Sequence, residues 1–356
     1  MKLITVSLAA SLLGACAVDF EDEVTLDPVA KPQCDDWGCG MNSPYIDNLG
    51  FHSLKIDGSL GENRFQIWKF EKNGVIYDLH VRGGVITGTA PGHYDLAAYS
   101  TANPLVGAKI HLLQDGQPSW EFLIAAVGRV SSWANQNGSN LSIETYKLKW
   151  AIPGLPDEKF QDVCSGSSTE GGMPLYHAVV FEGDVIDADS KRYRGIDTNV
   201  FNIGCAGNTL AKLALMAHTE PAKQQGFVTT EVERQTLLKM YSADYCGTGK
   251  AFTVGGQPLK YSDDKDWINS TGLAKVEAVW DRNGAVCLNQ PRVLADPIPE
   301  STHYFSDVET QMAAECKNRV HPERPPACPT GTSMSNPFPY HLVSTNKSLL
   351  IWPHPL

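Results

Sequence analysis

The sequence predicts a mainly β protein with two helices, an α+β body whose antiparallel sheet forms a sandwich or an open barrel and is stapled by disulfides. Three observations lead to this fold class. Short runs rich in β-branched and aromatic residues recur from residue 65 to about residue 205, and Asn-Gly and Asp-Gly dipeptides separate them as hairpin turns would. Two helical patterns follow, and eight cysteines lie beyond the N-terminal leader.

Each predicted strand gathers apolar residues over a short stretch that a turn signal ends. The stretches before the helices are Gln66–Phe70, Val75–Val81, Lys109–Leu113, Trp120–Ile124, Ser142–Trp150 and Tyr176–Phe181. After the helices, Val276–Trp280 and Ala285–Leu288 flank Asp281-Arg-Asn-Gly284, a strong hairpin signal. This spacing favours antiparallel strands over alternating strands and helices.

Two helices interrupt the strands. The first is predicted over Thr209–His218 and is apolar nearly all round, so we expect it to be buried. The second begins with Thr230 and Glu233, which have the spacing of a capping box. Gly247 is placed to end this helix in the left-handed conformation, which puts Cys246 in its last turn.

The first residues have the layout of an export signal. Lys2 precedes a short apolar run, Leu3–Leu13, which falls short of the roughly 20 residues that span a bilayer. The run closes on Leu-Gly-Ala-Cys16, which resembles a bacterial lipobox, so we expect Cys16 to be lipidated and to become the mature N-terminus. Ala17 stands where an Asp would favour the inner membrane, so we expect an anchor in the outer membrane, facing the periplasm or the exterior. The alternative is an ordinary signal peptide cut near Ala15.

Charge and composition narrow the partners. With 29 basic and 40 acidic residues the net charge is −11, and it is spread without long blocks of like charge, which argues against nucleic acid. The motifs HExxH, GxGxxG and GxSxG are absent, and Gly249-Lys250 lacks the rest of a phosphate-binding loop. We therefore expect no metal and no cofactor. Membrane contact is expected only through the lipid anchor, and the protein or glycan partner stays open.

Eight cysteines remain after Cys16, and an even number in an exported chain favours disulfides because the periplasm is oxidising. They are Cys34, Cys39, Cys164, Cys205, Cys246, Cys287, Cys316 and Cys328. Eight cysteines allow roughly a hundred pairings, and counting does not choose among them. The pairing that we predict is Cys34–Cys39, Cys164–Cys205, Cys246–Cys287 and Cys316–Cys328.

The stretch MYSADYCGTG, residues 240–249, places an acid, a phenol and a thiol side by side. A nucleophilic Cys246 with Asp244 beside it is one interpretation. The C-terminal end of a helix and the charge of Asp244 both oppose a thiolate, however, so a disulfide is favoured. Cys205 lies three residues before Asn208, the predicted cap of the first helix, and is the second candidate nucleophile.

Several of these residues together resemble a known family. Met240-x-x-Ala-Asp-Tyr-Cys-Gly-x-Gly249, Phe252-Thr253, Ala278-x-Trp280-x-x-x-Gly-Ala-Val-Cys287 and Pro291-Arg292 look like the ADYC domain of bacterial exported proteins and lipoproteins, which is named for the tetrapeptide. Upstream, Asn202–Cys205 with Leu210-Ala-Lys212, and Trp37–Pro44 with Phe51–Leu54, resemble segments of such proteins. The resemblance covers about residues 34–54 and 142–293 and implies no established activity.

The chain departs from this family at two positions. Members often carry one cysteine directly after the Ala-Lys pair and another nine residues before the cysteine of the tetrapeptide, and here these positions are Leu213 and Leu237. The resemblance implies that a helix–helix disulfide of relatives is replaced here by a hydrophobic contact. A pair lost together favours a structural role for the family's cysteines.

The expected organisation follows from these segments. It has a signal peptide over 1–15, a lipid-anchored acidic linker over 16–33, a β-rich region over 34–141, an ADYC-like domain over 142–296 and a proline-rich C-terminal extension over 297–356. The extension is expected to be loosely structured until Leu349–Trp352.

No reaction follows from these residues. The leading hypothesis is a non-enzymatic envelope or surface protein that binds or scaffolds. The first alternative is an exported hydrolase that uses Cys205, or Cys246 with Asp244. The second is carbohydrate binding through exposed tryptophans such as Trp37, Trp68 or Trp133, for which core packing is the ordinary explanation.

Overall fold

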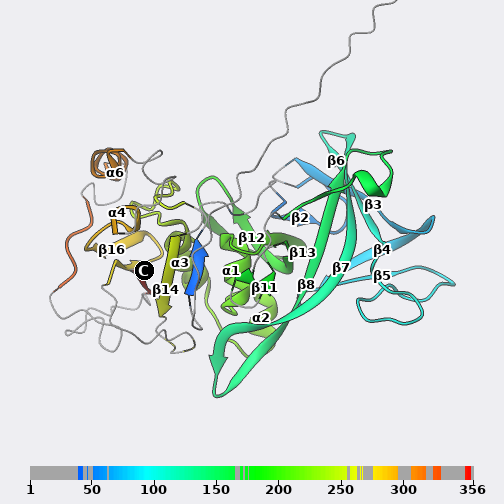
Figure 1. Ribbon diagram of the computed structural model, residues 1–356, viewed down its shortest axis with the longest axis horizontal. Coiled ribbons are helices and arrows are strands. Elements are labelled where there is room, and N and C mark those ends of the chain that lie inside the picture. Colours follow the sequence, from blue (N-terminus) through cyan, green and yellow to red (C-terminus); the bar gives the residue numbers. More distant parts are fainter. Residues whose placement is uncertain are drawn as a thin grey trace, which may run out of the picture.

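Two antiparallel sheets with helices between them form the described part of the protein (Figure 1). The computed structural model describes residues 39–42, 46, 51–61, 64–164, 169–170, 173–174, 176–254, 257–262, 265, 267, 276–295, 306–317, 324–329 and 349–353. The predicted signal peptide, Cys16, Cys34 and Trp37 lie outside these residues.

The larger sheet has ten strands among the described residues, in the order β2-β13-β12-β8-β7-β6-β3-β4-β5, with β9 paired to β8. These strands are β2 (Leu54–Lys55), β3 (Phe65–Lys72), β4 (Val75–Arg82), β5 (Val85–Thr89), β6 (Lys109–Gln114), β7 (Gln117–Gln136), β8 (Ser139–Ala151), β9 (Gln161–Asp162), β12 (Ala178–Asp187) and β13 (Arg192–Cys205). A short helix, η1 (Asp157–Lys159), precedes β9, and β10 (Thr169–Glu170) pairs with β11 (Met173–Pro174). The Asn-Gly and Asp-Gly turns that the sequence predicts connect β3 to β4, β6 to β7 and β7 to β8.

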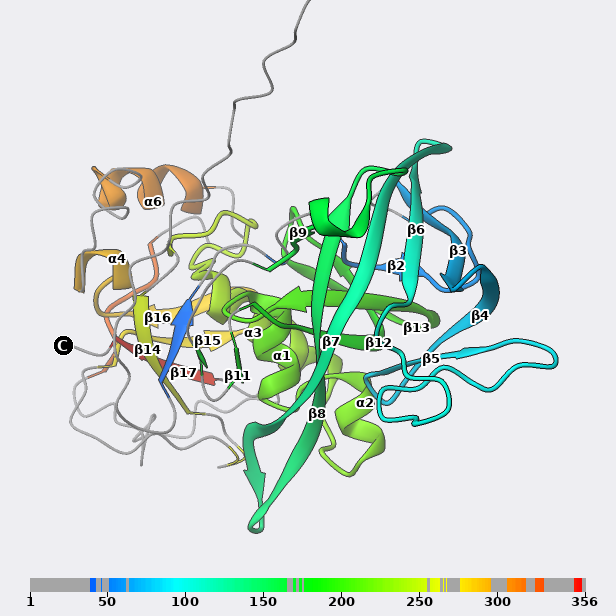
Figure 2. The same ribbon diagram turned by 45° about the vertical axis from the view of Figure 1, so that its right-hand side comes forward.

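The larger sheet is curled but not closed, as Figure 2 shows from the side. Its edge strands β2 and β5 do not pair with each other. The turn between β4 and β5 instead reaches β12, where the carboxylate of Glu182 accepts hydrogen bonds from the backbone N–H groups of Gly83 (2.7 Å) and Gly84 (3.1 Å). Apolar side chains fill the inside of the curl. The mainly β, open antiparallel body is therefore confirmed.

Two apolar cores meet at β12 and β13. Val180 and Phe201 belong to the core inside the curled sheet, whereas Val179 and Phe181 belong to a second core that includes the helices. Successive residues of a strand point to opposite faces, so a strand that separates two cores is apolar at every position. The run Ala178–Phe181, in which all four residues are apolar, is explained in this way.

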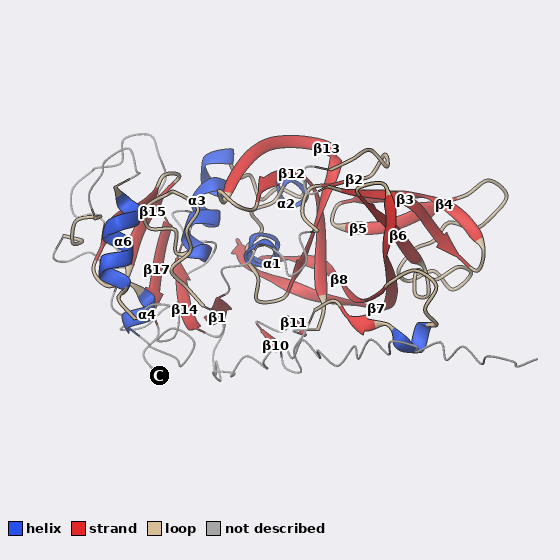
Figure 3. Cartoon of the chain, turned by 90° about the horizontal axis from the view of Figure 1, so that it is seen from above, coloured by secondary structure: helices blue, strands red, loops and turns tan. Residues whose placement is uncertain are grey.

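The smaller sheet has the order β1-β14-β17-β15-β16. Its strands are β1 (Cys39–Asn42), β14 (Gln257–Ser262), β15 (Ala278–Asp281), β16 (Gly284–Leu288) and β17 (Leu349–Pro353). Figure 3 shows α1 (Thr209–Leu215) and α3 (Glu231–Ser242) between the sheets. α1 packs on β12 and β13, and α3 packs on β13, β15 and β16. α2 (Glu220–Gln224) covers β12, and α4 (Arg292–Ala295) and α6 (Val308–Cys316) lie at the end remote from the larger sheet (Figure 1).

Both predicted helices are shorter than expected, and each ends in a left-handed alanine. α1 ends at Leu215 rather than at His218, and α3 ends at Ser242, so Cys246 lies beyond the helix and not in its last turn. Ala217 (φ 59°) and Ala243 (φ 52°) take the conformation that was assigned to Gly247. At the end of α3 the N–H groups of Ala243 and Asp244 donate to the carbonyls of Met240 and Lys239, which is a Schellman motif.

The disulfides confirm one predicted pair and contradict two. Among the described residues Cys164 bonds to Cys205 as predicted, but Cys246 bonds to Cys316 and Cys287 bonds to Cys328. The predicted Cys246–Cys287 and Cys316–Cys328 pairs were wrong because α6 was not foreseen. Its residues Val308, Met312 and Cys316 recur every fourth position on one buried helix face, which brings Cys316 to Cys246. The predicted Cys34–Cys39 pair falls outside the described residues.

Three further features bear on the expected organisation. The boundary expected between residues 141 and 142 falls within β8, and the larger sheet continues across it. The C-terminal extension, expected to be loose, contains α6. Leu213 and Leu237 are both buried in the second core, on the packed helices α1 and α3. No helix within the described residues has the length and apolarity needed to cross a membrane.

Candidate functional site

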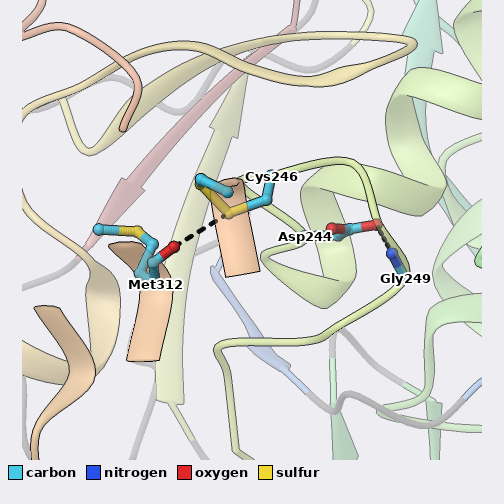
Figure 4. Close-up of a disulfide and its surroundings, with 5 residues drawn as sticks. Asp244, Cys246, Gly249 and Met312 are labelled. Atoms are coloured by element: carbon cyan, nitrogen blue, oxygen red, sulfur yellow. Dashed lines mark hydrogen bonds between the residues drawn. A yellow bond between two sulfur atoms is a disulfide. The ribbon is translucent and has the colours of Figure 1, made fainter. Parts of the chain in front are cut away.

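The tetrapeptide Ala243–Cys246 and the residues up to Gly249 form a tight turn after α3, here called the signature turn. Asp244 is fully buried in it, and its carboxylate accepts a hydrogen bond from the Gly249 N–H at 2.7 Å (Figure 4). The same carboxylate accepts a hydrogen bond from the Lys239 ammonium, also at 2.7 Å. A Schellman motif usually adds an apolar contact between the two residues that here are Lys239 and Asp244. In this chain an ion pair takes the place of that contact.

The ion pair also ties the signature turn to the larger sheet. Lys239 donates further hydrogen bonds to the carbonyl of Ser190, in the turn between β12 and β13, and to the carbonyl of Gly247. Burial raises the pKa of Asp244 and lowers the pKa of Lys239, and the attraction between the two charges opposes both shifts. A buried pair of this kind holds the turn in one conformation. Asp244 therefore stabilises the turn, and its side chain is not exposed to solvent.

Tyr245 belongs to a second buried network. Its hydroxyl donates to the carboxylate of Glu277, which directly precedes β15, and accepts from the backbone N–H of Arg292, which begins α4. The Arg292 guanidinium donates to the same Glu277 oxygen at 2.9 Å and to the carbonyls of Met240 and Tyr241. A cation thus satisfies the C-terminal carbonyls of α3. The residues Tyr245, Glu277 and Arg292, two of them within the resemblance motifs, join the signature turn and the end of α3 to the start of β15 and to α4.

Cys246 completes the signature turn. Its disulfide with Cys316 joins the turn to α6, and its sulfur lies 3.6 Å from the carbonyl oxygen of Met312 (Figure 4). Gly247, with φ 75°, follows where a Cβ atom would lie 1.9 Å from the carbonyl oxygen of Asn283 in the β15–β16 hairpin. Only glycine fits there.

The two candidate nucleophiles are neither free nor close to each other. Cys205 is bonded to Cys164 and belongs to the core of the curled sheet, whereas Cys246 belongs to the core around the helices. A disulfide sulfur has no thiolate to offer, so neither residue is a nucleophile in this state of the protein. The residues that the sequence singled out for chemistry hold the fold together.

A hollow lies instead where two neighbouring strands separate. β8 and β12 pair at only two positions, Ala178 with Tyr146 and Val179 with Thr145, and then diverge. The space beyond this point holds a small hollow of about 30 Å³ that is partly open to solvent. Its polar lining comes from the β4–β5 turn, β8 and the region of α2, namely Gly83, Gly84, Ser142, Glu144, Thr219 and Gln225. We call it the Glu144 hollow.

Glu144 is the titratable residue of this hollow. It is only 5% exposed, and one of its carboxylate oxygens accepts a hydrogen bond from the hydroxyl of Tyr146 at 2.5 Å. That hydroxyl in turn accepts from the Ile86 N–H at 2.8 Å, which fixes its orientation. Burial raises the pKa of Glu144, and the hydrogen bond from Tyr146 and the charge of Arg129 oppose this. Because Glu144 is a buried carboxyl that also lines a concave site, the Glu144 hollow is the candidate binding site.

Alternation along β8 is the signal that could have found Glu144. Glu144 shares its strand face with Tyr146 and Leu148, both of which are fully buried in the core of the curled sheet. A carboxylate in register with an apolar face must be buried with them or lie at the edge of that core. This residue was not singled out from the sequence.

The candidate tryptophans divide between surface and core. Trp68 is 51% exposed and lies edge-on to His111, whereas Trp133 packs against the core around the helices. Tyr94 and Tyr99, on the long loop between β5 and β6, are more exposed than Trp68, at 76% and 54%. Within the described residues no group of three or more His, Cys, Asp and Glu side chains is placed to hold a metal ion.

Comparison with known proteins shows the family to which the chain belongs. No curated protein and no solved structure matches the chain. The model of the ADYC domain matches residues 102–294, more than half of the chain. This range begins in the loop before β6. It includes β6 to β8, β12 and β13, the helices α1 to α3 and the signature turn, and β8 and β12 are the strands beside the Glu144 hollow. The chain therefore belongs to the ADYC domain family.

Proposed function

We propose that this protein is an exported, lipid-anchored binding protein of the bacterial outer membrane, without a reaction of its own, and that its ligand occupies the Glu144 hollow. The lipidated residue is Cys16, and the acidic stretch after it, residues 16–33, is the spacer between lipid and body. Disulfides suit this compartment, because the periplasm keeps them oxidised.

One observation carries the proposal. The side chains of Asp244 and Cys246 in the signature turn make buried contacts with other parts of the protein, an ion pair and a disulfide. Glu144, in contrast, is a buried carboxylate that lines the Glu144 hollow. Disulfides and buried ion pairs hold the framework rigid, and rigid frameworks favour binding because little freedom is lost when a ligand enters. All residues that line the hollow except Gly83 and Gly84 lie within the family match, so most of the hollow belongs to the part of the chain that defines the family.

A second candidate function is glycan binding on the outer surface. The exposed Tyr94 and Tyr99 favour it, because aromatic rings with one polar end are common in recognition surfaces. Asn103 holds this loop in place, since its side-chain amide donates to the Tyr94 carbonyl and to the Tyr77 hydroxyl. Substituting Tyr94 and Tyr99 together by Ser would abolish glycan-array binding if this surface is used.

The proposal is tested by thermal unfolding of the mature protein in the presence of small amines, carboxylates and neutral sugars. We expect at least one class to raise the melting temperature of the wild type and to lose this effect in Ser142→Phe, which crowds the exposed mouth of the hollow. Stabilisation by no class, or an unchanged response of Ser142→Phe, would refute binding at the hollow.

The anchor is tested separately. Mass spectrometry of the N-terminal peptide of the exported protein should find a diacylglycerol-modified Cys16. An unmodified Cys16 would contradict the lipoprotein assignment and leave the binding proposal to its own test.

A further inference from the structure

The buried carboxylates of the described residues fall into two groups. Four have a cation beside them, and the pairs are Asp184 with Arg234, Glu233 with Lys265, Asp244 with Lys239, and Glu277 with Arg292. Their nitrogen–oxygen distances lie between 2.5 and 3.1 Å. Removing water from a carboxylate is expensive unless a cation or several donors replace it, so this pairing is what burial requires.

The remaining two buried carboxylates are Glu144 and Glu182. Glu182 is satisfied by the backbone N–H groups of Gly83 and Gly84, one on each carboxylate oxygen. Glu144 has the Tyr146 hydroxyl on one oxygen, and among the described residues no Lys, Arg or His forms an ion pair with it. Among the described residues, Glu144 is therefore the buried acid that has neither a cation in contact with it nor an N–H donor on each oxygen, and it lines the hollow.

The nearest candidate partner on the sheet is engaged elsewhere. Arg129 of β7 stands directly opposite Glu144 of β8 in the strand register. Its guanidinium lies over the ring of Tyr99, 4.4 Å from the ring centroid. A cation held against an aromatic ring keeps a favourable contact of its own. The charge of Arg129 stabilises the ionised form of Glu144 from a distance, and Arg129 is not among the residues that line the hollow.

We propose that the Glu144 hollow binds a primary ammonium group, with Glu144 as its counter-charge. This inference rests on the proposed binding function and names the ligand class. A primary ammonium carries three N–H donors and so needs about three acceptors. Residues that line the hollow carry such acceptors, namely the carboxylate of Glu144, the hydroxyls of Ser142 and Thr219, and the amide oxygen of Gln225, whose nitrogen donates to the Pro221 carbonyl.

The lining also discriminates between cations. A quaternary ammonium has no N–H donor and is usually held by several aromatic faces, whereas the hollow's lining includes a single aromatic residue, Phe181. The ammonium belongs either to a small free amine or to a lysine side chain of a partner protein, and both present the same group to Glu144.

The test is isothermal titration calorimetry on the full-length mature protein in detergent. The ligands are n-propylammonium, N-acetyl-lysine amide, n-propanol as the uncharged control and tetramethylammonium as the control without donors. Wild type should bind one or both primary amines and neither control. Glu144→Gln, which keeps the acceptor for Tyr146, should weaken amine binding about tenfold or more, and the exposed control Glu158→Gln should not.

The outcomes separate the two proposals. Binding of N-acetyl-lysine amide alone assigns the ammonium to a partner's lysine, and binding of propylammonium, with or without it, assigns it to a free amine. Equal affinity of wild type and Glu144→Gln, or equal binding of tetramethylammonium, overturns the ammonium inference. If carboxylates or sugars stabilise the wild type but not Ser142→Phe, the binding function stands and the ammonium inference fails. If Ser142→Phe responds to every class as the wild type does, both fail.

Discussion

Arg292 is the residue whose loss should damage this fold most through a single ion pair. Its guanidinium and the Glu277 carboxylate are both fully buried, and Arg292→Met removes the cation while filling much of the same space. Removing one partner of a buried pair costs about 3–5 kcal/mol, because the other charge stays buried without compensation. The carbonyls of Met240 and Tyr241 also lose donors, at about 1 kcal/mol each. We expect a loss of about 5–7 kcal/mol, a large part of the stability of an ordinary domain.

Urea unfolding followed by tryptophan fluorescence measures this loss. Trp280 is a local reporter, because it is fully buried and its ring stacks on that of Tyr245 at 5.1 Å. Arg292→Met combined with Glu277→Leu should recover most of the ion-pair part of the loss, since an apolar pair leaves no buried charge. The control is Arg64→Met, whose ion pair with Asp115 is exposed and is worth less than about 1 kcal/mol. A loss no larger for Arg292→Met than for Arg64→Met would refute the reasoning.

Three further predictions concern other parts of the chain. Gly247→Ala should cost at least about 3 kcal/mol because its Cβ would meet the Asn283 carbonyl oxygen, whereas Gly74→Ala, with φ 79° and nothing within 4 Å, should cost only about 1 kcal/mol of backbone strain in the same urea assay. Burial lowers the pKa of His218 from 6.5 to about 4, so its folded form binds fewer protons than the unfolded chain between these values. The contribution of neutral His218 to the unfolding free energy is fully present above pH 6.5 and is lost as the pH falls through 4. The unfolding free energy of the wild type relative to His218→Gln should therefore fall by about 3 kcal/mol between pH 6.5 and pH 4. A difference that does not change with pH would contradict this. Burial raises the pKa of Glu144, so the wild type loses stability as the pH rises and this carboxyl ionises. Without ligand, Glu144→Gln should therefore have a higher urea midpoint than the wild type at neutral pH, and this difference should disappear in acid.

Local sequence patterns were sufficient to predict about half of the described strands. The run Val75–Val81 corresponds to β4, and Ser142–Trp150 lies within β8, because each alternates or gathers apolar residues between turn signals. β7 was predicted only over Trp120–Ile124 although it extends to Gln136. Its second half is rich in small and polar residues, and pairing with β8 across a long hairpin, rather than its own apolar pattern, keeps it extended.

Long-range partners were beyond the reach of sequence patterns. The Schellman turn of α3 was placed at Gly247 because glycine adopts positive φ cheaply, but the ion pair of Lys239 with Asp244 fixes it at Ala243. The partner of Cys246 could not be predicted without α6, because α6 carries Cys316, which is 70 positions away from Cys246 in the sequence. The four-residue spacing of Val308, Met312 and Cys316 is a local pattern that would have predicted this helix and its buried face.

The candidate site divides in the same way. The sequence drew attention to Asp244 and Cys246 because acids and thiols side by side are typical of catalysis, yet both are buried in structural contacts. Glu144 drew none, because a single glutamate in a strand is ordinary until its neighbours are known. Its burial depends on the β4–β5 turn and on the divergence of β8 from β12, which only the tertiary structure reveals.

The claim that the signature turn stabilises the fold while the Glu144 hollow binds is tested most directly by comparing two variants in one experiment. The Cys246→Ser and Cys316→Ser double variant opens a loop with a sequence separation of 70, which should cost about 4 kcal/mol of unfolding free energy. Below its unfolding transition it should bind n-propylammonium with wild-type affinity. Glu144→Gln should lose that affinity and be at least as stable as the wild type at neutral pH. A folded disulfide variant that cannot bind, together with a Glu144→Gln variant that binds normally, would contradict the assignment of the two roles.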